Sequence, residues 1–361
     1  AELSYRQAIK INPDFGDAHS NLGAILQDLG KLQEAEISYK KAIELKPDFD
    51  DALYNFGSLL LDLGKIEDYI ELSNSIIESE SVDERNKLVN SLSNSIAYLI
   101  KGSFPDYLFS LNRTKNLIDL GKVNSLKGKK DKQYFLSFFL FLTSLYPLIE
   151  KKSNNLDSEK IPHFGDSHCL SFAHQTLSIS SKLKQIQPVL IRGGKAWHFA
   201  NPNNNQWKDS LTQQIKNHTY SNKVFISFGE IDCRKDEGIL TYSSKNNKDI
   251  SEVCENTIKG YLDYMEKVLS QNYSRRYYFG IAAPTKTKEL LDALDNKRTK
   301  IVKLYNEYLK KEVLARGSYF LDVYALTSTK DGENNNLHMC DQFHLSPKCL
   351  SILFKDHLYE P

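Results

Sequence analysis

The stretch Ile161-Pro162-His163-Phe164-Gly165-Asp166-Ser167-His168 decides the fold of the larger part of the chain. Its first half is a short apolar run, and its second half combines glycine, aspartate and serine, which are typical of a tight turn. A serine at the turn that leaves a strand is where an α/β fold presents a nucleophile. The stretch therefore predicts a strand over residues 161–164 and makes Ser167 a candidate nucleophile.

Downstream of this turn, short β-rich runs alternate with amphipathic helical stretches. Such alternation predicts a parallel sheet with helices on both faces, which is a three-layer α/β domain. The expected strands cover Ile161–Phe164, Pro188–Ile191, Lys223–Phe228, Arg276–Ala282 and Ser318–Val323, and the longest expected helices cover Ile250–Gln271 and Lys286–Ala315. A further helix, His168–Leu183, is expected to begin beside Ser167, where unpaired backbone N–H groups would favour developing negative charge.

Upstream, the N-terminal part repeats itself. Pro13, Ala18, Leu22, Gly23 and Gly30 recur 34 residues later as Pro47, Ala52, Phe56, Gly57 and Gly64. With Asn21-Leu22-Gly23 and Tyr39-Lys40-Lys41-Ala42-Ile43, this period resembles the tetratricopeptide repeat (TPR) over residues 1 to about 70. The resemblance implies an all-α solenoid that presents a concave face to a protein or peptide partner. The first repeat keeps only its second helix, so we expect further repeats upstream.

Between the repeats and the α/β domain, the 34-residue pattern is lost, but helical spacing continues over Leu88–Ile100, Tyr107–Leu120 and Tyr134–Ile149. The apolar run from Phe135 to Ile149 is shorter than the roughly 20 residues of a membrane span and contains Pro147, which favours a buried helix. We predict TPR repeats over residues 1–70, a helical adaptor over 71–155 and the α/β domain over 156–361.

The composition excludes several classes of function. A formal net charge of +1 does not point to a surface for nucleic acid, so no nucleic-acid partner is expected. The five cysteines are odd in number and form no C-x-x-C pair, which favours reduced thiols and a cytoplasmic location. The spacing of His163, His168 and His174 fits no zinc pattern, so no metal and no cofactor are expected.

Residues from about 160 onward resemble the SGNH hydrolases, also called the GDSL-like esterase and acyltransferase superfamily, which implies a flavodoxin-like parallel sheet. The four sequence blocks of that family correspond in order to Gly165-Asp166-Ser167, to Gly193 or Gly194, to Gly229-Glu230-Ile231-Asp232, and to Asp341 with His344. The resemblance implies that Ser167 is the nucleophile, that His344 is the general base and that Asp341 orients this base. It also implies an oxyanion hole made by the N–H groups of Ser167 and of Gly193 or Gly194, completed in the family by an asparagine side chain.

The third block departs from the family because Ile231 stands at the position of that asparagine and cannot donate a hydrogen bond. In an extended segment, Glu230, Asp232 and Arg234 would share one face and lie near a substrate. Arg234 is the preferred substitute donor or a clamp for an anionic substrate, although an ion pair with a neighbouring carboxylate is an equally good interpretation.

The two tryptophans, Trp197 and Trp207, flank a polar loop. They could form a stacking platform for a sugar, or they could simply bury their rings.

These patterns favour a serine esterase that removes an acyl group from a glycan or small molecule through an acyl-Ser167 intermediate. An O-acyltransferase with the same three residues, or a TPR scaffold with a degenerate SGNH domain, are the alternatives. Similar repeats occur beside bacterial carbohydrate-modifying domains, which favours, by analogy, delivery of the enzyme to a glycoprotein or polysaccharide machine.

Overall fold

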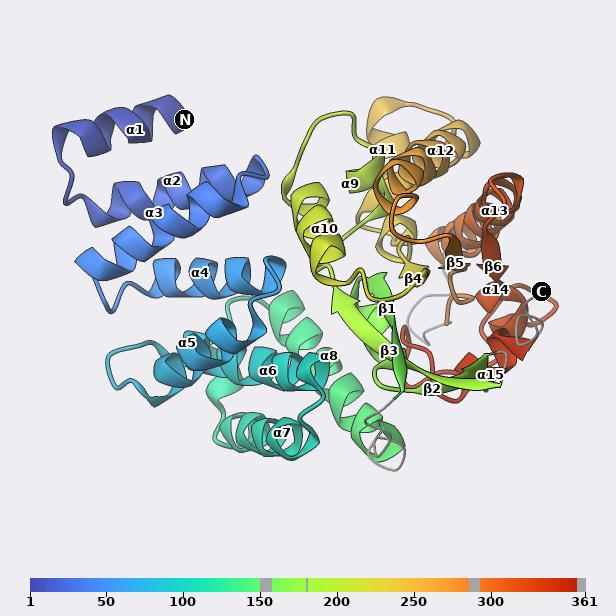
Figure 1. Ribbon diagram of the computed structural model, residues 1–361, viewed down its shortest axis with the longest axis horizontal. Coiled ribbons are helices and arrows are strands. Elements are labelled where there is room, and N and C mark those ends of the chain that lie inside the picture. Colours follow the sequence, from blue (N-terminus) through green and yellow to red (C-terminus); the bar gives the residue numbers. More distant parts are fainter. Residues whose placement is uncertain (150–157, 180, 286–292, 356–361) are drawn as a thin grey trace. The chain divides into compact units, whose positions relative to one another are not determined.

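The computed structural model describes residues 1–149, 158–179, 181–285 and 293–355 (Figure 1). The chain forms two compact units. Unit 1 comprises Ala1–Tyr146 and Asn204–Gln214, and unit 2 comprises Pro147–Asn203 and Ile215–Pro361. The expected boundary between residues 155 and 156 lies outside the described residues, as do the first residues of the helix expected over 286–315.

Unit 1 is built from consecutive helices joined by short turns. They are α1 (Glu2–Ile11), α2 (Gly16–Asp28), α3 (Leu32–Leu45), α4 (Asp50–Asp62), α5 (Ile66–Glu78), α6 (Glu84–Lys101), α7 (Phe104–Asp119) and α8 (Lys129–Ile149), with the 3-10 helix η1 (Lys122–Ser125) between the last two. Neighbours in sequence pack on one another, from α1 on α2 to α6 on α7. This is the arrangement that paired helical repeats require, because each repeat buries its apolar face on the next.

The repeat core contains a buried chain of polar contacts as well as apolar side chains. The Tyr39 hydroxyl donates to Gln27 Oε1 at 3.2 Å, and Gln27 Nε2 donates to Asp62 Oδ2 at 3.1 Å. These bonds join α3, α2 and α4. Because the polar groups are satisfied by one another, they can lie inside the core without a large desolvation cost.

Unit 1 also includes the segment Asn204–Gln214, which belongs to the C-terminal part in sequence. The Ser210 hydroxyl donates to the Asp62 carbonyl at 2.8 Å. Helix α10 (Gln206–Asn217) thus meets the C-terminal end of α4.

In the described part of the chain, none of the helices combines the length and the hydropathy that crossing a bilayer demands.

Unit 2 contains a six-stranded sheet in the order β2-β3-β1-β4-β5-β6. Its strands are β1 (Glu159–Gly165), β2 (Thr176–Ile179), β3 (Lys182–Leu190), β4 (Lys223–Ser227), β5 (Arg275–Phe279) and β6 (Tyr319–Leu321). All neighbouring strands are parallel except β2, which is antiparallel to β3 at the sheet edge. The α-helices of this unit are α9 (Ala196–Ala200), α11 (Gly238–Asn246), α12 (Ile250–Leu269), α13 (Ala293–Ala315), α14 (Val323–Thr327) and α15 (Cys349–Leu353).

The predicted fold class is confirmed: helical repeats precede a largely parallel sheet with flanking helices. One element is wrong, because the helix expected over His168–Leu183 does not form. The first part of this segment forms a 3-10 helix, η3 (Ser167–Phe172), and the rest forms β2 and the start of β3. In Thr176–Ile179, two polar residues alternate with two apolar ones, and Leu177 and Ile179 are buried. This two-residue period fits a strand with one face on the core.

We predict that Gly23→Ala destabilises unit 1 by about 2 kcal/mol, within the usual range for overpacking. An added Cβ at Gly23 would lie 2.8 Å from two ring carbons of the buried Tyr39. Gly57 is the matched control in the next repeat, where the nearest ring carbon of Tyr69 would lie at 3.2 Å. At Gly57, the higher helix propensity of alanine over glycine, worth up to about 1 kcal/mol, offsets the cost of this milder contact.

The chain offers a separate fluorescent reporter for each unit, because Trp207 lies in unit 1 and Trp197 in unit 2. Denaturant unfolding followed by Trp207 emission in a Trp197→Phe background measures unit 1 alone. Equal losses at the two glycines would contradict the close approach of Tyr39 to Gly23.

Candidate active site

The candidate site lies at the carboxyl edge of the central strands. In the sheet register, Gly165 at the end of β1 pairs with Leu190 of β3 and with Ser227 of β4. The turns that follow these three strands therefore start at the same level, although they are far apart in sequence. This edge is where open parallel sheets collect their ligands. It brings the first, second and third sequence blocks together.

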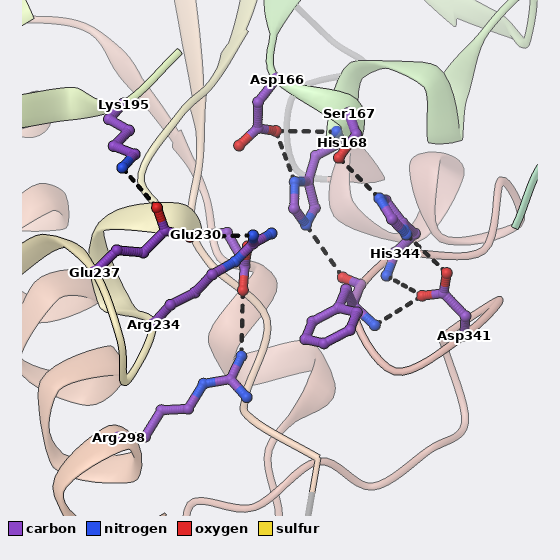
Figure 2. Close-up of polar contacts among 11 residues, drawn as sticks. Asp166, Ser167, His168, Lys195, Glu230, Arg234, Glu237, Arg298, Asp341 and His344 are labelled. Carbon is purple, nitrogen blue, oxygen red and sulfur yellow. Dashed lines mark hydrogen bonds and ion pairs between the residues drawn. The ribbon is translucent and has the colours of Figure 1, made fainter. Parts of the chain in front are cut away.

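Ser167, His344 and Asp341 form one hydrogen-bonded chain (Figure 2). His344 Nε2 lies 2.9 Å from Ser167 Oγ, and His344 Nδ1 lies 2.8 Å from Asp341 Oδ2. A carboxylate only accepts hydrogen bonds, so Nδ1 carries the proton and Nε2 offers its lone pair to the serine hydroxyl. The structure thus brings together the three residues that the sequence singles out, in the order that nucleophilic catalysis requires.

The surroundings of these three residues keep the imidazole of His344 neutral and the carboxylate of Asp341 charged. Burial lowers the pKa of His344, and although Asp341 opposes this, the net shift is downward. Burial alone would raise the pKa of Asp341, but its hydrogen bond with His344 outweighs this and holds the pKa below its ordinary value. The backbone N–H groups of Phe343 and His344 also donate to Asp341 Oδ1, at 2.7 and 2.6 Å. At neutral pH His344 is therefore available as a base.

His168, which follows Ser167, makes a second carboxylate–imidazole pair at the site. Its Nδ1 lies 2.7 Å from Oδ1 of Asp166, and its Nε2 lies 3.2 Å from the Phe343 carbonyl (Figure 2). Burial lowers the pKa of His168, but the charge and hydrogen bond of Asp166 outweigh it and raise the pKa to about 9. Sequence reasoning considered this histidine only as a metal ligand. Its position two residues after an aspartate is the pattern that could have indicated the pair.

Of the three backbone N–H groups that the sequence predicts for an oxyanion hole, one is already engaged in a hydrogen bond. The N–H of Gly194 donates to the Ile191 carbonyl at 3.0 Å, so it is already engaged. Among the hydrogen bonds of the described residues, none uses the N–H of Gly193 or that of Ser167. The φ angle of Gly193 is 63°, which is a left-handed conformation that glycine adopts without strain. Of the two glycines that the sequence leaves open, Gly193 therefore keeps its donor available.

The third block is a 3-10 turn, η4 (Ile231–Cys233), and the extended conformation expected for residues 230–234 is wrong. Glu230 already has right-handed helical φ and ψ, so alternate residues do not share a face. Ile231 is buried at 9% exposure. Asp232 is fully buried and accepts the N–H groups of Ala196 and Trp197 at 2.8 and 2.9 Å, which holds the start of α9. Burial raises the pKa of Asp232 to about 7 despite these two bonds.

Glu230 and Arg234 lie one turn apart and form an ion pair, with Arg234 Nη2 at 2.7 Å and Nε at 2.9 Å from Glu230 Oε2. Arg298 of α13 binds the other oxygen of Glu230 at 3.2 Å (Figure 2). Both guanidinium groups lie over the ring of Phe343, at 5.8 and 5.7 Å from its centroid. The sequence-predicted Arg234 is thus held by a carboxylate, and Arg298 is a member of this cluster that sequence reasoning missed.

Trp197 lines a cavity of about 270 Å³ together with Tyr242. The two rings lie 4.6 Å apart with an angle of 49° between their planes. The lining also includes side chains with hydrogen-bonding groups, among them Asn201, Lys248, Glu252 and Asn256. The arrangement combines aromatic faces with polar groups, and Trp197 is anchored to the third block through its own N–H and Asp232.

The chain combines helical repeats with an α/β domain that follows them and holds a hydrogen-bonded serine, histidine and aspartate. Residues 16–49 match the family model described as tetratricopeptide repeat, which confirms the predicted repeats. The search of curated proteins gives no match.

Three solved structures are similar to the chain. One is a protein of Streptococcus pneumoniae provisionally described as a platelet activating factor, with 18% identity, a TM-score of 0.40, and coverage of 64% of this chain and 100% of that chain. An extracellular lipase of Streptomyces rimosus has 12% identity and a TM-score of 0.35, covering 55% of this chain and 100% of its own. A phospholipase A1 of Streptomyces albidoflavus NA297 has 12% identity and a TM-score of 0.34, covering 55% of this chain and 99% of its own.

We predict that Glu230→Gln destabilises unit 2 by about 3 kcal/mol, because it removes the buried carboxylate that pairs with two largely buried guanidinium groups. The matched control is Glu237→Gln. Glu237 contacts Arg234 at 3.5 Å and Lys195 at 2.7 Å, but its side chain is 32% exposed, so its loss should cost less than about 1 kcal/mol. Denaturant unfolding followed by Trp197 emission in a Trp207→Phe background measures the difference. Similar losses in both variants would mean that the Glu230 cluster does not stabilise the unit.

Proposed function

We propose that this protein is a serine esterase that acts on O-acylated glycans through an acyl-Ser167 intermediate. The observation that carries the proposal is the hydrogen-bonded chain from Ser167 Oγ through His344 to Asp341. A serine hydroxyl is a weak nucleophile until a base takes its proton, and this geometry supplies that base.

The reaction follows from the positions of these groups. Ser167 Oγ attacks the ester carbonyl carbon while His344 Nε2 takes its proton, and Asp341 stabilises the resulting imidazolium. The N–H groups of Ser167 and Gly193 would bind the oxyanion of the tetrahedral intermediate. Collapse of this intermediate breaks the bond to the alcohol oxygen, which receives the proton from His344. Water, deprotonated by the same histidine, then attacks the acyl-Ser167 ester. The bond to Ser167 Oγ breaks, His344 returns the proton to this oxygen, and the carboxylic acid is released.

Arg234 is better suited to bind an anionic part of the substrate than to act as a third donor to the oxyanion. Its Nε and Nη2 are committed to Glu230. Its remaining terminal nitrogen, Nη1, lies 3.5 Å from Glu237, which is a longer and weaker contact. A group that is held this way keeps a fixed positive charge near the site. Glu230 and Asp232 act in this proposal by positioning Arg234 and Trp197.

The cavity at Trp197 and Tyr242 supports a sugar as the alcohol part of the substrate. Aromatic faces bury the apolar C–H surface of a sugar ring, and amide or carboxylate side chains bind its hydroxyl groups. The cavity offers both kinds of group, with Asn201, Asn256 and Glu252 around the two rings. The same cavity favours a second candidate function, transfer of the acyl group from Ser167 to the hydroxyl of an acceptor sugar. The TPR repeats would then bring a protein partner to the enzyme.

We predict that a fluorophosphonate probe labels the wild type and that Ser167→Ala abolishes the labelling. Hydrolysis of 4-nitrophenyl acetate should fall by roughly four to six orders of magnitude in kcat for Ser167→Ala and His344→Gln. Ser171→Ala is the matched control, because Ser171 is a buried serine on the same 3-10 helix whose hydroxyl has no hydrogen-bond partner among the described residues. Absence of labelling in the wild type would instead favour a scaffold with a degenerate site.

We predict that Trp197→Ala raises KM for acetylated xylo-oligosaccharides about tenfold, which corresponds to the loss of about 1.4 kcal/mol of stacking. Turnover of 4-nitrophenyl acetate should change less than twofold, since this small ester does not need the cavity. Trp207→Ala serves as control and should leave both substrates unaffected. Equal losses on both substrates would show that Trp197 supports the fold rather than a sugar. Acetylated products that appear when free sugar is added would identify the transferase.

A further inference from the structure

Both ring nitrogens of His168 face atoms that can only accept hydrogen bonds. Nδ1 faces a carboxylate oxygen of Asp166 at 2.7 Å, and Nε2 faces the main-chain carbonyl oxygen of Phe343 at 3.2 Å. A neutral imidazole carries one proton and can satisfy only one of these acceptors. Both bonds form together only when the ring is an imidazolium. The carboxylate it faces is 2% exposed, so the positive charge has a fixed and desolvated partner.

This imidazolium joins the two turns that carry the nucleophile and the base. Asp166 precedes Ser167, and it also accepts the backbone N–H of His168 at 3.0 Å. On the other side, Phe343 lies between Asp341 and His344. Its N–H donates to Asp341 and its carbonyl accepts from His168, so both faces of this residue's backbone are held. A loop that is fixed in this way keeps the base within reach of Ser167.

The same ring stands beside the proposed base. The centroids of the His168 and His344 rings are 5.0 Å apart, and the ring planes are tilted by 33°. Two positive charges at this separation repel each other strongly in a partly desolvated site. A permanent charge on His168 therefore disfavours a second proton on His344.

We propose that His168 is a positioning residue for this esterase: a constitutive imidazolium that ties the Ser167 turn to the Asp341–His344 loop and keeps His344 in the neutral state that can accept a proton. The inference rests on the proposed function for the role of His344, whereas the charge and contacts of His168 do not depend on it. It adds to the serine, histidine and aspartate a fourth group that acts through the base without touching substrate.

The charges around the two rings set the sign of the expected effects. Burial lowers the pKa of His344, Asp341 raises it, His168 lowers it and Asp166 raises it. Around His168, burial lowers the pKa, Asp166 and Glu230 raise it, and Arg234 lowers it. Removing the charge of His168 alone leaves Asp166 uncompensated and should raise the pKa of His344. Removing both charges together should return that pKa most of the way to its original value.

The test compares wild type, His168→Gln and the double variant Asp166→Asn/His168→Gln in the pH dependence of kcat/KM for 4-nitrophenyl acetate. We expect the acid limb of the profile to move up by about one pH unit in His168→Gln, as a charge at 5 Å in a partly screened site would produce. In the double variant the limb should lie between those of the other two enzymes, while the plateau rate stays low because the link to Phe343 is lost. A purely structural role would lower the rate without moving the limb. An unmoved limb in His168→Gln, or equal limbs in the single and double variants, would overturn the proposal.

A second measurement does not need turnover. In the full chain with ¹⁵N-labelled histidine, the His168 ring resonances are those missing from His168→Gln among the nine histidines. Both ring nitrogens should keep the shifts of a protonated imidazolium between pH 6 and 8, and a single neutral tautomer at pH 7.5 would refute the assignment. If the wild type neither reacts with fluorophosphonate nor hydrolyses esters, the esterase proposal fails, while the state of His168 is still decided by these resonances.

Discussion

The hydrogen bond between Ser167 Oγ and His344 Nε2 is the constraint on which the rest of the site depends, because it joins residues 177 positions apart in sequence. Such a contact must overcome the entropy of closing a long loop, so it has to be supported on both sides. The sheet register supports Ser167 by fixing the end of β1 between β3 and β4. Asp341 and His168 support His344 by holding the backbone and side chains of its loop. The support of Ser167 is made by backbone pairing, whereas both supports of His344 use a charged side chain, which explains why ionised groups gather around the base.

Two carboxylate–imidazole pairs lie side by side in opposite protonation states. His344 faces a carboxylate on one nitrogen and a hydroxyl on the other, so a neutral ring satisfies both contacts. His168 faces an acceptor on each nitrogen, which only the cation satisfies. Environments that push two pKa values apart define which group can serve as acid or base. Each ring has its own aspartate on Nδ1. The two rings differ in the group that faces Nε2, which is a hydroxyl for His344 and a carbonyl oxygen for His168.

The sequence predicted most of the fold because its two parts have clear periods, 34 residues in the repeats and alternating strands and helices downstream. It missed β2 because a strand of four residues with two buried side chains is too short to distinguish from a helical turn. In the site, the residues of short motifs were predicted, since Ser167 and the Asp341–His344 pair are local patterns. The choice of Gly193 over Gly194 depends on a backbone bond to Ile191, and the place of Arg298 depends on how α13 packs. Neither follows from local spacing.

Ile231, which stands where the sequence resemblance leads one to expect an asparagine, changes what the third block can do. An apolar side chain at this position packs inward, and the 3-10 turn directs its polar neighbours to separate tasks. Glu230 gathers Arg234 and Arg298 over the ring of Phe343, the residue whose backbone Asp341 and His168 hold. Asp232 fixes the first N–H groups of α9, and α9 carries Trp197 to its cavity. The block thus connects the Asp341–His344 loop with the cavity at Trp197, and in the proposed reaction it supports both of them instead of supplying a donor to the oxyanion.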